Sequence, residues 1–305
     1  MRRRHAAVAA ATVAAALAAS PAPALANQRT ENLPWPQLLP PVPVTTKVQP
    51  HGVPHCRRAS VGCMDDLLRR LHRQWRRLNA ACDHRALFSL AYIRITQGLR
   101  DDIARRPPKL IRYRRWMVDV IIDFSNHYFQ YFNAYAQHRP VPDAWKIAYD
   151  EVMHGDTNGG QDVLLASSAH TQHDLPYIYA AMGMRTPGGA SRKPDHDAVN
   201  AINAGVFVGL EHYYAQHYDP LFTTIMKSSP LDQIGTLETV KGWREGAWRN
   251  AERLLNARTA AERHQVEQSI DIDSRVWAEA MFSVTQPGYR ATRDAYCRAK
   301  LAHGA

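Results

Sequence analysis

Apolar side chains recur at helical spacing along most of the chain after residue 65. The first such stripe contains Leu67, Leu68, Leu71, Trp75 and Leu78, and positions three and four apart share one face of a helix. The same period predicts helices over residues 85–104, 110–136, 161–184, 195–218, 231–257, 260–282 and 291–302, with another beginning near residue 142. Alternation of Val, Ile and Thr at strand period is almost absent. We therefore expect an all-α single domain of about eight or nine helices.

Proline, aspartate and glycine mark where these helices should end or begin. Pro107 and Pro108 should end one helix, and Pro176 should interrupt or kink the helix over 161–184. Asp195 is placed to cap the N-terminus of the following helix. In the helix over 231–257, Arg244 and Glu245 could reach into a cleft, but we expect them to form an exposed ion pair.

The first 62 residues differ in character from the rest. Three arginines, an Ala/Val-rich stretch and the small-x-small sequence Ala24-Leu25-Ala26 predict a signal peptide over residues 1–26, leaving about 279 residues after cleavage. Residues 27–62 are rich in proline and predict an extended arm, which Trp35, Leu38 and Leu39 could pin to the helical domain over 63–305. No later apolar run is long enough for a transmembrane segment. We expect a secreted or cell-wall-associated protein.

The four cysteines fit that location. An even number of cysteines in an exported chain predicts two disulfides, for which three connectivities exist. We favour Cys56 with Cys63 as a short local loop and Cys82 with Cys297 as a long tie.

Basic residues outnumber acidic ones, giving a formal net charge of +10 and about +7 after removal of the signal peptide. Much of the excess lies in residues 69–77 and 112–115. These arginines form either an ordinary solvated helix face or a surface that attracts an anionic small molecule or a phosphate-rich envelope polymer. We expect no specific nucleic-acid partner.

The strongest candidate for chemistry is the segment from Ala169 to Pro176. On a helix, His170, His173 and Asp174 project from one face. Two imidazoles and a carboxylate can contribute to a site for a divalent metal, zinc above all, with iron or manganese as alternatives. Each residue alone could equally be structural, but burying the three together without a partner would be costly.

Two other clusters could complete that site. Asp119 and Asp123 lie four residues apart on a very apolar helix, so they either mark its wet face or oppose the histidines. His196 and Asn200 share one face of the following helix. We expect His170, Asp174 and Asp123 to be metal ligands, with His173, His196 and Asp119 beside them as catalytic groups.

Three motifs resemble an actinobacterial domain-of-unknown-function family, number 5995. They are Ala169-His170-x-x-x-Asp174-Leu175-Pro176, Ser191-Arg192-Lys193-Pro194-Asp195-His196-x-x-Val199-Asn200 and Arg244-Glu245-x-Ala247-Trp248. This resemblance implies an all-helical domain and no established activity.

More distantly, His170-x-x-x-Asp174 is similar to a step in the zinc-dependent phospholipase C and P1-nuclease group, in which zinc ions activate water and bind phosphate. That group has an N-terminal Trp ligand and a later His-x-x-x-Glu, where this chain has Asn27 and His212-x-x-x-Gln216.

The leading hypothesis is an exported metal-dependent hydrolase, acting on phosphoesters. The chain contains no Gly-x-Ser-x-Gly, P-loop, dinucleotide fingerprint or His-Glu-x-x-His. Two alternatives stay open: a non-catalytic envelope-binding protein that uses its basic surface, and an enzyme of another reaction type that uses the same cluster.

Overall fold

The computed structural model describes residues 33–44, 56, 60–222, 233–283 and 285–302. The chain divides into Met1–Leu33 and a compact unit, Pro34–Ala305, which contains all of the helices that the structure describes. The predicted signal peptide lies outside the described residues. The described residues are all-α, as predicted, and their β-structure is limited to one isolated bridge between Arg185 and Ser191.

The observed helices follow the predicted ones closely. The helices are α1 (Trp35–Leu38), α2 (Val61–Ala80), α3 (Arg85–Ala104), α4 (Arg114–Ala136), α5 (Asp143–His154), α6 (Gly159–Ser168), the π-helix η1 (Ala169–Asp174), α7 (Leu175–Met182), α8 (Lys193–His217), α10 (Gln233–Asn256), α11 (Ala260–Met281) and α12 (Tyr289–Ala302). In the part that the structure describes, no helix is long and apolar enough to cross a membrane.

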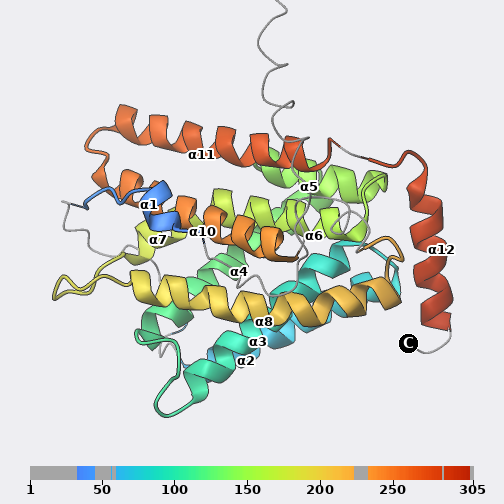
Figure 1. The fold of residues 1–305 in the computed structure, drawn as a ribbon, viewed down its shortest axis with the longest axis horizontal. Coiled ribbons are helices and arrows are strands. Elements are labelled where there is room, and N and C mark those ends of the chain that lie inside the picture. Colours follow the sequence, from blue (N-terminus) through green and yellow to red (C-terminus); the bar gives the residue numbers. More distant parts are fainter. Residues whose placement is uncertain (1–32, 45–55, 57–59, 223–232, 284, 303–305) are drawn as a thin grey trace, which may run out of the picture. The chain divides into compact units, whose positions relative to one another are not determined.

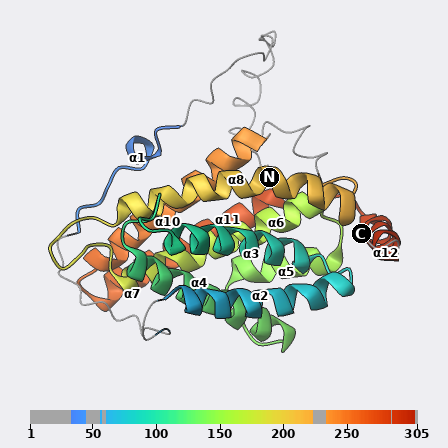
Figure 2. The same ribbon diagram turned by 90° about the horizontal axis from the view of Figure 1, so that it is seen from below.

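The helices pack in a way that surrounds the short segment η1. The helices α8, α10 and α11 run side by side (Figure 1), and α10 contacts both of the others. Helix α3 lies between α8 and α2 (Figure 2) and contacts both of them, and α2 also contacts α4. The segment η1 contacts α4, α5, α6, α7, α10 and α11, so it lies at the centre of this unit.

The proline-rich arm is attached to α10 through residues 35–39. Trp35 Nε1 donates to Glu238 at 3.1 Å, and its ring lies against Gly242. Arg249 Nε donates to the Leu39 carbonyl at 2.8 Å. The expected pinning of the arm by Trp35 is therefore observed, whereas the side chain of Leu38 is exposed.

Both favoured disulfides are present: Cys56–Cys63, and Cys82–Cys297 across 215 residues of sequence. The second joins the turn between α2 and α3 to α12. A buried ion pair, 3.2 Å long, joins Arg293 of α12 to Asp162 of α6. Together they hold the last helix against the body of the protein.

The expected capping role of Asp195 is wrong. Helix α8 begins two residues earlier, at Lys193, and the Asp195 carboxylate instead accepts hydrogen bonds from the backbone N–H groups of Arg112 and Tyr113, at 3.0 and 2.6 Å. Those groups lie just before α4. A buried carboxylate that accepts backbone N–H groups is a stable arrangement, so Asp195 joins the start of α8 to the start of α4.

Candidate functional site

The segment with His170, His173 and Asp174 is a π-helix rather than part of a regular α-helix. Residues Ala169–Asp174 form η1, and Leu175–Met182 then form α7 with Pro176 in its first turn. Proline has no N–H to donate to the carbonyl four residues earlier, so a regular helix cannot pass through it. The predicted interruption is real, but it lies before Pro176 and takes the form of a wider turn. Such π-segments are frequent at functional sites.

Asp174 is the centre of this segment. Its Oδ2 lies 2.7 Å from His170 Nδ1, its Oδ1 lies 2.7 Å from His173 Nδ1, and Trp145 Nε1 donates to Oδ2 at 3.0 Å. The carboxylate is completely buried. Burial alone would raise the pKa of Asp174, but the hydrogen bonds from His170 and His173 outweigh it and lower the pKa to about 2. Asp174 is therefore an anion that orients its three donors.

His170 lies in an aromatic environment that keeps its ring neutral. The ring stacks on Phe124, with centroids 3.4 Å apart, and Tyr92, Phe88 and Trp145 surround it. Burial lowers the pKa of His170, and the hydrogen bond to Asp174 offsets that effect only in part. Because Nδ1–H donates to Asp174, the neutral ring carries its lone pair on Nε2. Nε2 is buried and has no hydrogen-bond partner among the described residues.

His173, unlike His170, is positively charged. Its Nε2 lies 3.2 Å from Asp271 of α11, so the ring is held between two carboxylates. Burial alone would lower the pKa of His173, but the hydrogen bonds to Asp174 and Asp271 raise it to about 9. His173 and Asp271 also line a surface hollow of about 510 Å³, together with His127, Tyr131 and His264. His173 is therefore a cation at neutral pH that connects the buried Asp174 to the surface.

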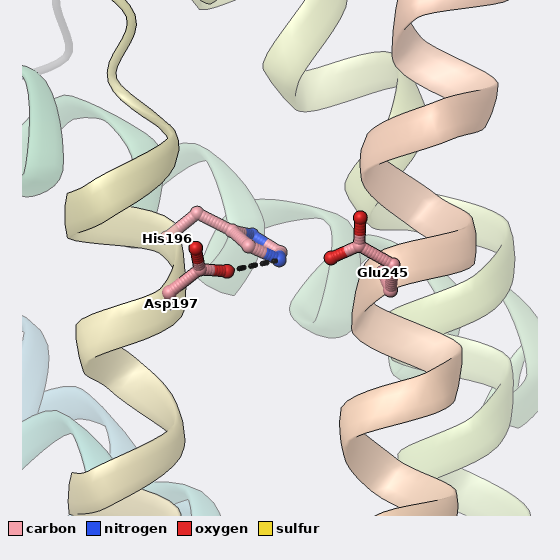
Figure 3. Close-up of side chains that lie close together, drawn as sticks. All are labelled: His196, Asp197 and Glu245. Carbon is pink, nitrogen blue, oxygen red and sulfur yellow. Dashed lines mark ion pairs between the residues drawn. The ribbon is translucent and has the colours of Figure 1, made fainter. Parts of the chain in front are cut away.

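A second group of side chains forms where the start of α8 meets α10 (Figure 3). His196 is completely buried, its Nδ1 lies 2.7 Å from the Tyr179 hydroxyl, and its Nε2 has no hydrogen-bond partner among the described residues. Burial, and then the positive charge of Arg244, hold the pKa of His196 well below its ordinary value. His196 is thus a second neutral imidazole, from a different helix.

His196, Asp197 and Glu245 are the candidate metal ligands within the described part of the chain. One ligand atom of each lies within 4.8 Å of the others. However, the Lys193 ammonium contacts Glu245 at 2.7 Å and also Asp197, and Arg249 contacts Glu245 as well. A cation already neutralises both carboxylates, so these residues do not suit a metal ion in this arrangement.

Arg244 is the second cation of this group, and its surroundings are unusual. Its Nε donates to Asn200 Oδ1 at 2.7 Å, and its Nη2 donates to the His196 carbonyl at 2.6 Å. The expected exposed ion pair of Arg244 with Glu245 is wrong, because both residues are buried and Glu245 pairs with Lys193 and Arg249. Among the described residues, no carboxylate forms an ion pair with Arg244.

Each of the two groups contributes side chains to one cavity of about 70 Å³ between α3, α4, α6, α7, α8, α10 and the π-helix. Both His170 and Arg244 belong to its lining, as do Tyr179 and Asn203. The remaining lining is mostly apolar and includes Tyr92, Leu99, Met117, Val120, Phe124 and Val199. An apolar cavity with a few convergent polar groups is the usual form of a small-molecule site.

The structure brings some of the predicted site residues together and leaves others apart. His170, His173 and Asp174 form one hydrogen-bonded group, and His196 reaches the same cavity lining through Tyr179. Asp119 and Asp123 are half-buried on α4 and are not among the lining residues. His170, Asp174 and Asp123 do not form a group with metal-ligand spacing, in the residues that the structure describes.

Sequence reasoning missed Tyr179 and Asp271 as members of the site. For Arg244 it allowed a position in a cleft but favoured an exposed ion pair with Glu245, and the cleft is what the structure shows. Residues adjacent in a helix point in different directions, so each of these two side chains needed a separate partner. Asp271 had no comparable signal, since its contact with His173 depends on how α11 packs.

The three sequence motifs that carry the family resemblance meet around this cavity. The family of unknown function DUF5995 matches residues 64–284. No curated protein and no solved structure matches the chain, and the resemblance to the phospholipase C and P1-nuclease group gains no support from these comparisons. The match spans the helical unit from α2 to the end of α11 and covers most of the chain. The chain therefore belongs to the DUF5995 family.

Proposed function

We propose that this protein is an exported hydrolase of phosphoesters that works in the cavity lined by His170 and Arg244. One observation carries the proposal: Asp174 holds the neutral His170 ring by Nδ1 and leaves Nε2 without a partner, in a cavity that also contains a buried arginine with no carboxylate partner among the described residues. The two disulfides support the exported location, because such bonds persist in oxidising compartments.

His170 would act as a general base and then as a general acid. Nε2 takes a proton from a water molecule as the water oxygen attacks phosphorus, and the bond from phosphorus to the leaving oxygen breaks. The proton on Nε2 then passes to the leaving alcohol. Asp174 fixes the tautomer and stabilises the imidazolium that forms, as the carboxylate does in other Asp–His pairs.

Arg244 would bind the anionic group of the substrate. A planar guanidinium donates to two phosphate oxygens at once, and its charge is worth more in an apolar cavity than in water. The hydrogen bonds to Asn200 and to the His196 carbonyl fix its position before the substrate arrives. Preorganised donors of this kind stabilise the charge that develops in the transition state.

The proposal gives His170 and Asp174 different roles from those expected from sequence. Asp174 accepts three N–H donors, so little of its carboxylate is left for a metal ion. A metal at His170 Nε2 would also lack other ligands, because no carboxylate, thiol or second imidazole is among the cavity-lining residues. We therefore propose hydrolysis by a histidine base, which should persist when metal ions are removed.

The test is hydrolysis of bis(p-nitrophenyl) phosphate and p-nitrophenyl phosphate by the purified protein, with and without EDTA. We expect turnover that resists EDTA, that falls by about a thousandfold or more in His170→Gln, and that declines only at pH values below 6.5, since the pKa of His170 is lowered. His212→Gln is the matched control, because His212 is exposed on α8. Loss of activity in EDTA would return the metal hypothesis to first place, and no turnover of either ester would refute the proposal.

A second function has one observation in its favour. Arg69, Arg70, Arg73, Arg76 and Arg77 are all exposed along α2. A row of exposed arginines attracts a polyanion, which is the alternative of a non-catalytic envelope-binding protein. Binding to an anionic polymer that survives His170→Gln but is lost when these arginines are replaced would support it.

A further inference from the structure

A second cavity adjoins the cavity beside His170. The neighbouring space, of about 30 Å³, lies between α3, α6, α8 and α10. Ala91 of α3 and Phe207 of α8 line both spaces, so the two meet at these side chains. On the same measure, one water molecule needs about 10–15 Å³, so each space exceeds what a single water requires.

The second cavity is even more apolar than the first. Its lining includes Val163, Leu164, Val206, Leu210 and Phe222. Native interiors are packed to crystal density and contain few voids larger than a water molecule. Two adjoining apolar spaces in one core therefore leave much hydrocarbon surface without contacts, which costs stability unless a ligand fills it.

The arginine and the histidine both belong to the first cavity. Arg244, His170 and Asn203 line it, whereas the second cavity has no arginine, lysine or histidine among its described lining residues, and its polar side chains include Glu211 and Thr236. Ile95, Phe124 and Phe207 are only half-buried, so the first cavity approaches the surface between α3, α4 and α8. A ligand that satisfies both parts has an anionic head and a hydrocarbon tail.

We infer that the two cavities form one channel for an alkyl chain, whose anionic head pairs with Arg244. This inference deepens the proposed function, on which it rests for the identity of the reaction, by naming the substrate class as esters of a long-chain amphiphile. Binding itself needs no turnover. It requires only the guanidinium at one end of the channel and the apolar walls of the rest.

The test is displacement of a fluorescent dansyl-labelled undecanoic acid from the full protein by a series of saturated carboxylates from hexanoate to dodecanoate. We expect affinity to rise about fourfold with each methylene until the channel is filled. Dodecyl phosphate is the second anionic competitor, and its affinity relative to dodecanoate tells whether the head is a phosphate or a carboxylate. Dodecyltrimethylammonium has the same tail and the wrong charge, and it should compete poorly.

Two variants separate the head from the tail. Arg244→Gln should weaken dodecanoate by about tenfold or more and leave dodecanol unchanged, with Arg253→Gln on the same helix as its control. Ala91→Met narrows the junction of the two cavities, so long carboxylates should lose affinity while hexanoate keeps it. Ala104→Met, on the same helix but lining neither cavity, is the control for that change.

The outcomes distinguish this inference from the proposed function. All binding measurements are repeated in His170→Gln, where binding should persist without hydrolysis. Equal competition by the carboxylate and the ammonium amphiphile, or no dependence on chain length, would overturn the channel. Turnover of p-nitrophenyl phosphate with no binding of any amphiphile would keep the proposed function and remove the channel. Binding of these amphiphiles without turnover of either ester would keep the channel and remove the proposed function.

Discussion

Replacing His173 should change how the stability of the protein depends on pH. The pKa of His173 is raised from 6.5 to about 9, so the folded protein holds a proton that the unfolded chain loses near pH 6.5. At 1.36 kcal/mol per pH unit, this difference amounts to about 3 kcal/mol. It is an upper bound, because Asp271 is 59% exposed and water screens its part of the interaction.

The stability that the His173 charge contributes decreases as pH rises. A raised folded-state pKa contributes stability that is fully present below about pH 6.5 and is lost as pH rises through about 9. Between those values the unfolded chain binds fewer protons than the folded protein, so the free energy of unfolding falls as pH rises. The variant His173→Asn places an amide nitrogen near the Nδ1 position, and it keeps a neutral donor for Asp174 while removing the charge.

The assay is urea unfolding followed by tryptophan fluorescence, for wild type and His173→Asn, from about pH 5.5 to about pH 9.5. The difference in free energy of unfolding between the two proteins should be largest at the acidic end and shrink by about 2–3 kcal/mol toward the alkaline end. Other titrating groups are common to both proteins and cancel in the difference. Asp271→Asn, which leaves Asp174 in place, should show a smaller change of the same sign. A difference that stays constant with pH would refute the assignment of His173 as a buried cation.

Three further predictions concern stability and the basic surface. Cys82→Ser, which opens a 215-residue loop, should lower the free energy of unfolding by about 5 kcal/mol, and Cys56→Ser, which opens a loop of seven, by about 2 kcal/mol in urea titrations; the reverse order would contradict the loop-entropy argument. Asp102→Asn should cost about 1–3 kcal/mol, because Asp102 is buried and accepts three successive backbone N–H groups, and an unchanged melting temperature would contradict this. Replacing Arg73 and Arg76 together by Glu should weaken binding to polyphosphate and reduce its salt dependence, and an unchanged salt slope would show that α2 is an ordinary solvated face.

The helices could be predicted from the sequence because their signals are local. The apolar period, Pro107 and the loop before α8 fix most helix ends to within a few residues, and α3 matches its predicted range. The favoured disulfide pairing, one of three possible connectivities, is also confirmed. The π-helix could not be predicted from the sequence. Pro176 shows that a regular helix must be interrupted nearby, but it does not indicate the π-helical turn, in which Asp174 accepts a hydrogen bond from Trp145 of α5.

The site could be predicted only in part, because its residues form hydrogen bonds and ion pairs with residues of helices that are distant in the sequence. His170 and Asp174 share a face in any helical arrangement, and they do meet. Arg244 and Glu245 carry opposite charges side by side in sequence, yet each is paired by residues of α8. No local pattern reports which helix will face which. Sequence therefore identified the chemical groups, and the packing decided their roles.

The two histidines that contact Asp174 differ in charge because their surroundings differ. A single buried carboxylate cannot balance two cations, so one histidine becomes charged and the other stays neutral. His173 takes the charge because Asp271 and the surface hollow stabilise it, and His170 stays neutral because its environment is aromatic. Environments that push the pKa values of neighbouring groups apart assign one as base and the other as fixed charge. The charge of His173 thereby keeps Asp174 ionised, and an ionised Asp174 holds His170 in the tautomer that a general base requires.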